Sequence, residues 1–345
     1  MAKTKNPKFF RKNKGGKTTR ILKRGLTAKE KSEVKEIAKK TIVNVAEAKY
    51  MNTQRIIADR PAPSIAGADV RVSVLAYSTS LSSDGGGISL TYGKNDVGGD
   101  QPITELKMLR PFVGVTGNNQ TDNYAVEGRE CMPKSANVKW RMSRDIGGVL
   151  DYQSLPINNI PDLTTSLPII CRMIRVNPKQ SQTNVLCNPK FDLFLDRFNN
   201  AVGLEIGSFE DTELLSYRLN RRRYNVVEDK FFRIQNGLTL TYQLDNNSAS
   251  GNDFYMPQIS NTNGNCEKIY STNHQLTQKK GGSVFYDSPD ANALEAPSSG
   301  HKREFILYHF CYAGAETYLS DSNTGPSHPT NLLLSATPTV KFTDI

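Results

Sequence analysis

The stretch ANVKWRMSR, residues 136–144, alternates apolar and polar side chains without interruption. Every second residue forms the apolar side: Ala136, Val138, Trp140 and Met142. Successive side chains of a β-strand point to opposite faces of the sheet, so this period of two predicts a strand with one buried face. Such strands are typical of antiparallel sheets that have a core on one side and solvent on the other.

Other parts of the chain carry strand patterns of two kinds. The same alternation recurs in VRVSVLAY (70–77), in LTLTYQL (238–244) and in the C-terminal residues 332–342. By contrast, PIICRMIRV (168–176) and EFILYHFCY (304–312) are apolar on both faces. We expect these two segments to lie in the middle of a sheet or against an interface.

The patterns together predict an all-β fold with about eight principal strands. They are expected near 68–77, 104–116, 136–144, 168–176, 221–228, 230–244, 303–314 and 331–343. Eight strands in two facing sheets is the number of a jelly roll, so we expect an eight-stranded antiparallel jelly-roll sandwich. Another β-sandwich or a barrel stays open, because strand order cannot be read from one sequence.

A helical segment is expected before the strands begin. Thr27 and Glu30 form a capping-box pattern, and apolar residues then recur at helical spacing. We expect a short amphipathic helical segment within 27–58, packed on its own domain or a neighbour, although a helix on nucleic acid or membrane is an alternative. The Pro/Ala/Gly-rich residues 59–67 then act as a hinge to a jelly-roll domain at 68–345.

A second helix is expected at 189–198, where Asn188 is a good N-cap and Pro189 suits the first helical position. Long polar stretches separate the predicted strands, and loops of this length usually carry function or decorate a surface. They cover residues 78–102, 151–166 and 245–302. We expect the last of them to be an insertion that could form an outer protrusion.

The excess of positive over negative charge is confined to the N-terminal residues 1–24. The chain has 44 Lys and Arg against 34 Asp and Glu, and residues 1–24 hold ten of these cations and no acid. The remaining 34 cations therefore balance the 34 acids, so the body is formally neutral. Few apolar residues interrupt this segment, and we expect a disordered basic arm over residues 1–26.

A flexible polycation binds a line of phosphates by releasing counterions, without reading its sequence. The predicted nucleic-acid-binding residues are the ten cations of the arm: Lys3, Lys5, Lys8, Arg11, Lys12, Lys14, Lys17, Arg20, Lys23 and Arg24. A further basic run, Arg221, Arg222 and Arg223, could line an inner surface against nucleic acid or pair with carboxylates across a subunit contact.

Other classes of site have little support in the sequence. Five widely spaced cysteines are expected to be free thiols, and the four histidines form no zinc signature. Carboxylates such as Asp162 and Asp253 could bind calcium between subunits, but their spacing does not specify a metal, and no cofactor is expected. No catalytic motif is recognised, so we do not expect an enzyme. No apolar run is long enough to span a bilayer.

The order of several segments resembles a known family. LNRRRYNVVEDKFFRI (219–234) joins a basic run, a β segment, Asp-Lys and an aromatic β segment; PIICRMIRVNPKQSQT (168–183) precedes it and KREFILYHFCYAG (302–314) follows it. This order resembles the single jelly-roll capsid proteins of small circular Rep-encoding single-stranded DNA viruses, especially bacilladnavirus-like ones. It is also similar to nodavirus-like and satellite-virus-like capsid proteins. The long segment 245–302 departs from the minimal form of that family.

The resemblance implies a coat protein that self-assembles into an icosahedral shell and packages a single-stranded genome, DNA rather than RNA, through its arm. The expected partners are further copies of the chain and the genome, and the expected location is the virion. Assembly would take place in the host cell, and the basic arm could direct nuclear import. The alternative is a cellular β-sandwich binding module, lectin-like or nucleic-acid-binding, with a basic tail.

Overall fold

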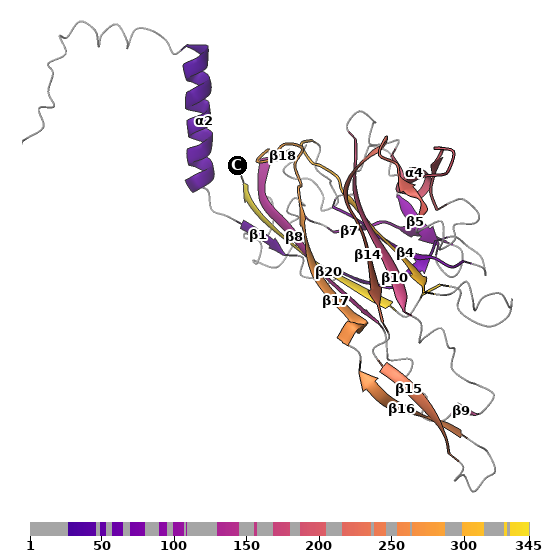
Figure 1. Cartoon of the computed structure of the whole chain (residues 1–345). Coiled ribbons are helices and arrows are strands. Elements are labelled where there is room, and N and C mark those ends of the chain that lie inside the picture. Colours follow the sequence, from indigo (N-terminus) through magenta and orange to yellow (C-terminus); the bar gives the residue numbers. More distant parts are fainter. Residues whose placement is uncertain are drawn as a thin grey trace, which may run out of the picture. The chain divides into compact units, whose positions relative to one another are not determined.

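A computed structural model represents the whole chain (Figure 1). The residues that it describes are 27–45, 49–52, 57–64, 70–79, 90–94, 99–106, 108, 130–144, 155–156, 168–179, 187–204, 216–235, 238–245, 254–262, 264–286, 299–313, 328–329 and 332–344. The chain divides into two compact units, Met1–Glu47 and Ala48–Ile345. The second unit contains the β structure, and each unit is described by itself.

The described residues of the first unit form the helix α2 (Ala28–Val45). The predicted capping box is confirmed, since Thr27 Oγ1 accepts from the Glu30 backbone N–H at 3.3 Å and Glu30 Oε2 accepts from the Thr27 N–H at 2.8 Å. The helix is shorter than the segment expected at 27–58. Two strands, β1 (Lys49–Asn52) and β2 (Ile57–Asp59), occupy its C-terminal part because both pair with the last strand of the chain.

The second unit contains a first sheet built on the longest strands, and we call it sheet A. Its strand order is β1, β20, β8, β17, with β2 beside β20 and β18 beside β8. The strands not yet bounded are β8 (Glu130–Arg144), β17 (Glu267–His274), β18 (Val284–Phe285) and β20 (Leu332–Asp344). All of its pairings are antiparallel.

A second sheet, sheet B, has the order β14, β10, β19, β4, β3, with β7 beside β4. Its members are β3 (Ala62–Pro63), β4 (Ser73–Ser78), β7 (Thr104–Glu105), β10 (Ile169–Pro178), β14 (Tyr224–Ile234) and β19 (Phe305–Tyr312). Only the short β4–β7 pairing is parallel among those described. The predicted all-β sandwich is confirmed at this level, since the fold consists mostly of antiparallel sheets.

The long strands pair in a nested way along the chain. β1 pairs with β20, β4 with β19, β8 with β17, and β10 with β14. Each pair thus encloses the next one in sequence, from the outermost pair to the innermost. Two further pairings, β20 with β8 and β19 with β10, join the nested pairs into the two sheets.

The main core lies between the two sheets. Trp140 of β8 is fully buried, and its ring centre lies 5.1 Å from that of Tyr77 in β4 and 5.3 Å from that of Tyr308 in β19. The Trp140 indole N–H donates to Thr272 Oγ1 of β17 at 2.8 Å. The alternation at 136–144 is therefore explained, because its apolar side packs into this core.

Sheet B is buried on its other face as well. A second core packs there, with Ile174 and Val176 of β10 and Phe305 and Leu307 of β19 among its members. This explains why PIICRMIRV and EFILYHFCY are apolar on both faces, since β10 and β19 are adjacent central strands of the sheet. Four short strands contribute to this second core: β5 (Thr91–Lys94), β11 (Phe194–Leu195), β12 (Ala201–Val202) and β13 (Arg218–Leu219). Leu193, which follows the short helix α4 (Pro189–Asp192), belongs to it as well.

Two small sheets complete the described β structure, apart from the sheet of β11, β12 and β13. β5 pairs with β6 (Asp100–Pro102). β15 (Leu238–Asp245), β16 (Phe254–Thr262) and β9 (Leu155–Pro156) form the other, and a 3-10 turn at Gly264–Cys266 leads from it into β17.

Several expected elements differ from those found. The strands predicted at 221–228 and 230–244 are instead one continuous strand, β14, followed by β15. Asp229 and Lys230 do not form a turn, because Arg172 of the neighbouring strand forms an ion pair with Asp229 in mid-strand. The insertion predicted at 245–302 contains β17, a full strand of sheet A. Of the strand predicted at 104–116, residues 107 and 109–116 lie outside the described residues.

The second predicted helix is also shorter than expected. Its N-cap is confirmed, because Asn188 Oδ1 accepts from the Lys190 N–H at 3.0 Å, but α4 ends at Asp192. Asp196 Oδ1 accepts from two backbone N–H groups, those of Phe198 and Asn200, at 2.8 Å each. This arrangement favours a turn over a helix. Of the predicted hinge at 59–67, Asp59 ends β2, residues 62–63 form β3, and residues 65–67 lie outside the described part.

Candidate nucleic-acid interface

The nested pairing gives the sandwich two distinct ends. At one of them β10 ends at Pro178 and β14 begins at Tyr224, and these two residues are paired. β17 ends and β19 begins at the same end, since Glu304 Oε1, just before β19, lies 3.2 Å from His274 Nδ1. The chain enters β1 there too, because Lys49 pairs with Phe342 near the end of β20. We call this the entry end.

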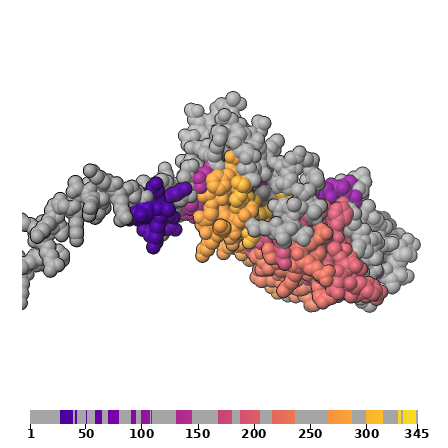
Figure 2. Space-filling model, turned by 90° about the horizontal axis from the view of Figure 1, so that it is seen from above, coloured from indigo at the N-terminus to yellow at the C-terminus, as the bar shows by residue number. Residues whose placement is uncertain are grey.

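Basic side chains gather at the entry end. Figure 2 looks down on the molecule from above and shows the segments 187–204 and 216–235 beside 264–286. A groove of about 730 Å³ begins at this end with Lys179, Arg221 and Arg222 and reaches Arg172 and Asp229 in the middle of β10 and β14. Its lining contains five cationic residues and one acid: Arg172, Lys179, Arg218, Arg221, Arg222 and Asp229. Leu195 and Val226 are among its other lining residues. The groove therefore combines a large excess of positive charge with apolar surface.

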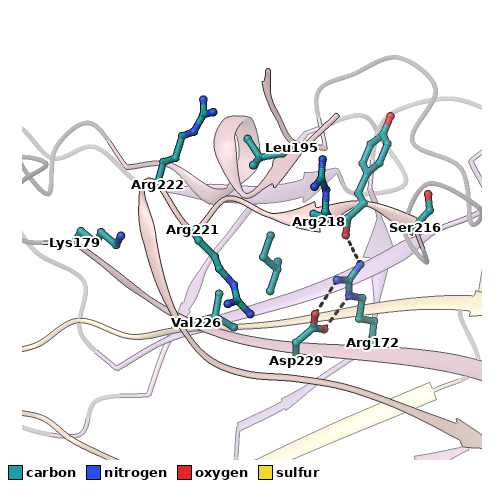
Figure 3. Close-up of a pocket in the computed structure, with 11 residues that line it drawn as sticks. Arg172, Lys179, Leu195, Ser216, Arg218, Arg221, Arg222, Val226 and Asp229 are labelled. Atoms are coloured by element: carbon teal, nitrogen blue, oxygen red, sulfur yellow. Dashed lines mark hydrogen bonds and ion pairs between the residues drawn. The ribbon is translucent and has the colours of Figure 1, made fainter. Parts of the chain in front are cut away.

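The base of the groove is a fixed ion pair. Arg172 of β10 donates from Nε to Asp229 Oδ1 at 2.9 Å and from Nη2 to Asp229 Oδ2 at 2.8 Å (Figure 3). Its Nη1 donates to the Tyr217 carbonyl at 3.2 Å. The guanidinium also lies 5.5 Å from the ring centre of Phe194 and 5.0 Å from that of Phe231. A bidentate pair held between two rings is rigid, so Arg172 shapes the groove rather than adding free charge.

The arginine run divides into two roles. Arg221 and Arg222 are exposed and line the groove, and neither side chain pairs with another side chain among the described residues. Figure 3 shows Arg221 turned toward Val226 and Arg222 turned away from it. Arg223 instead binds Asp192, with 2.6 Å between its Nη1 and Asp192 Oδ2. This contact lies within one chain, and it raises the pKa of Arg223.

Asp192 holds the turn that presents these arginines. Its carboxylate accepts from both Arg223 and the Tyr224 hydroxyl, and its backbone carbonyl accepts from the Asn220 side chain at 2.9 Å. Burial raises the pKa of Asp192, although the hydrogen bonds from Tyr224 and Arg223 act in the opposite direction. The turn at 220–223 is thus anchored to α4, while Arg221 and Arg222 project into solvent.

A second, smaller cavity of about 360 Å³ lies at the same end. Lys179 lines both cavities, and Lys302, Arg303 and His301 add to the second. Burial lowers the pKa of His301 to about 3, and the nearby charge of Arg303 acts in the same direction. His301 is therefore neutral at physiological pH, and the positive charge of this cavity comes from the lysines and the arginine.

A buried polar network joins the two sheets beneath this end. Arg175 of β10 donates to Glu304 Oε1 at 2.6 Å, to Glu228 Oε2 at 2.9 Å and to the Asn273 carbonyl of β17 at 2.6 Å. Burial alone would raise the pKa of Glu304, but His274 and Arg175 together hold it below the ordinary value. The network fixes the ends of β10, β17 and β19 relative to one another, and so supports the groove.

The structure tests the sequence predictions unevenly. The ten arm cations, Asp162 and Asp253 lie outside the described residues. Arg221 and Arg222 both line the groove, and their role in binding stays a prediction. All five cysteines are free, as expected. Within the described part of the chain, no cluster of three or more His, Cys, Asp or Glu residues could hold a metal ion, and no helix is suited to crossing a membrane.

Sequence reasoning missed Arg172, Lys179 and Arg218 as members of one surface with the arginine run. Arg218 could have been found, because it stands three residues before Arg221. The other two come from β10 and its end, and only strand pairing brings them close. Comparisons of this chain with protein-family models and with curated proteins find no match.

Proposed function

We propose that this chain is the coat subunit of a small icosahedral virus, a single jelly-roll protein that forms a closed shell around a single-stranded genome. The proposal rests mainly on one observation. The entire net charge of +10 belongs to residues 1–24, and behind them stands a formally neutral body whose long strands pair in nested order. Segregation of this kind suits a shell subunit, because neutral bodies can pack edge to edge while the arms neutralise phosphates.

The order of strands supports the finer assignment of the fold. In a jelly roll, a chain of four nested antiparallel pairs folds over so that its eight strands form two facing four-stranded sheets. The eight strands that correspond here are β1, β4, β8, β10, β14, β17, β19 and β20. On this assignment, β9, β15 and β16 belong to insertions at the end opposite the entry end, a suitable place for a protrusion.

The charge of the arms has a suitable magnitude for packaging. Sixty copies would bring roughly 600 positive charges inside a shell, and 180 copies about 1,800. Those numbers are on the scale of a genome of a few thousand nucleotides, so neutralisation by the arms would drive packaging. The resemblance of the strand segments to capsids of circular single-stranded DNA viruses favours DNA over RNA as the cargo.

Expression of the full chain tests this proposal. Purified material should contain closed particles by electron microscopy, and the particles should protect nucleic acid from added nuclease. Digestion of the released contents with DNase or RNase then identifies the genome type. A small oligomer that sediments alone, binds no nucleic acid and selectively binds glycans would instead support a β-sandwich binding module.

A further inference from the structure

We propose that the groove at the entry end binds the phosphates of single-stranded nucleic acid, so that the folded body makes a second contact besides the arm. This inference rests on the proposed function and deepens it. The groove has five cations against one acid, and that acid is already paired with Arg172. Its volume of about 730 Å³ is also within the range of ligand-binding sites, about 300–1,000 Å³.

The free cations are placed for phosphate. Arg221 and Arg222 are exposed neighbours on a turn that Asp192 anchors from below. Guanidinium groups match phosphate oxygens with two parallel hydrogen bonds, and a preorganised turn loses little entropy when it binds. Arg218 and Lys179 stand on the same lining, so several phosphates in succession could be contacted.

The groove also offers surface for bases. Phe231 is 49% exposed next to Arg172, and its ring belongs to the same face of β14 as the groove residue Asp229. Leu195 and Val226 supply apolar wall. Single strands bind where a basic groove follows the backbone and an exposed aromatic ring stacks on an unpaired base. A carboxylate from a neighbouring subunit would use the cations but not these apolar groups.

Two further observations favour a strand over a single anion. The groove and the smaller basic cavity share Lys179, so the positive surface continues from Arg222 toward Lys302. The chain also enters the body at this end, where β1 begins. The N-terminal segment therefore joins the body at the same end as the groove residues Lys179, Arg221 and Arg222.

The test uses the full chain and two matched double variants. Arg221→Ala/Arg222→Ala removes two cations from the groove, whereas Lys139→Ala/Lys268→Ala removes two exposed cations from sheet A. The probe is an oligodeoxynucleotide of about 15 nucleotides that contains 5-iodouracil. Each single-strand phosphate contact contributes about 0.7 to the slope of log affinity against log salt.

The groove variant should therefore lower the slope by about 1.4, and the control should leave it unchanged. Between about 50 and about 200 mM salt, the wild type should lose about sevenfold more affinity than the groove variant. Photocrosslinking of the wild type should label peptides that contain Phe231 or Tyr217. Circular dichroism should show that both variants stay folded, since no described partner is lost.

Two results would overturn the proposal. Equal slopes for the wild type and groove variant, with crosslinks confined to residues 1–24, would leave the body without a nucleic-acid contact. Loss of subunit association in the groove variant, with slope and crosslinks unchanged, would assign the groove to a carboxylate of a neighbouring copy. Particle formation is measured separately by electron microscopy. A chain that crosslinks as expected but forms no shells would refute the coat function and would still support nucleic-acid binding by the groove.

Discussion

Replacement of Arg175 by Met tests the buried network that supports the entry end. Arg175 is 6% exposed and donates to two carboxylates and one carbonyl, so its removal leaves Glu304 and Glu228 without their shared cation. Removal of one partner of a buried ion pair typically lowers the free energy of unfolding by about 3–5 kcal/mol. Glu304 keeps His274 and Glu228 keeps Lys230, so we expect the lower value, about 3 kcal/mol.

The expected loss depends on pH in a defined direction. The pKa of Glu304 is lowered in the folded protein, so its ionised form contributes stability above the unfolded pKa of about 4.5. That contribution is lost as the pH falls through the lower folded pKa. The difference between the wild type and Arg175→Met should therefore be largest near neutral pH and shrink in acid below about pH 4.5.

Urea unfolding of the monomeric chain measures this difference in the free energy of unfolding. Trp140 is the chain's one tryptophan and is fully buried between the sheets, so its fluorescence reports directly on their separation. Arg141→Met is the matched control, because Arg141 pairs with Glu267 on the surface, where such pairs contribute about 0–1 kcal/mol. If Arg175→Met lowers the free energy of unfolding no more than Arg141→Met does, the stabilising role of the network is refuted.

Two further predictions concern the arm and a buried histidine. Deletion of residues 1–24 should leave the circular dichroism of the body unchanged and remove most of the packaged nucleic acid, measured as the 260/280 nm absorbance ratio of particles; an unchanged ratio would contradict the role of the arm. Burial, and to a smaller extent the charge of Arg172, lowers the pKa of His309 to about 3 in the folded protein. As the pH falls, His309 is therefore protonated in the unfolded chain before it is protonated in the folded one. Between about pH 7 and pH 5 the wild type should lose about 2 kcal/mol more stability than His309→Asn, and parallel profiles would exclude this assignment.

The strands with one-sided or two-sided apolar patterns could be predicted from the sequence. The segments at 136–144, 168–176 and 331–343 correspond to β8, β10 and β20, because their apolar faces meet real cores. β17 was missed because its inward residues include Thr272 and His274, which are polar and find partners in each other, in Trp140 of β8 and in Glu304 just before β19. Hydrogen-bond partners that are distant in sequence produce no local pattern from which a strand could be predicted.

The candidate site, too, could be predicted only where the signal is local in sequence. The run 221–223 marked the groove locally, but its members separate because Asp192, about thirty residues earlier, binds Arg223 alone. The helix predicted at 189–198 failed for a related reason. Its apolar spacing was suitable, yet Phe198 is 69% exposed, and the Asp196 carboxylate instead closes a turn by accepting from the backbone N–H groups of Phe198 and Asn200. Spacing predicts a helix only where a surface exists to cover its apolar face.

The nested pairing has a consequence for the order in which a new chain can fold. β20 lies between β1 and β8 in sheet A, so β1 has no described partner strand until residues 332–344 have been synthesised. Pairings of such long sequence separation make folding slow, since the intervening chain must be ordered before they form. The sandwich can therefore close only after residues 332–344 have left the ribosome, whereas residues 1–24 leave it about 300 residues earlier. On the proposed function, a polycation that emerges long before its body folds meets nucleic acid before the chain is competent to assemble.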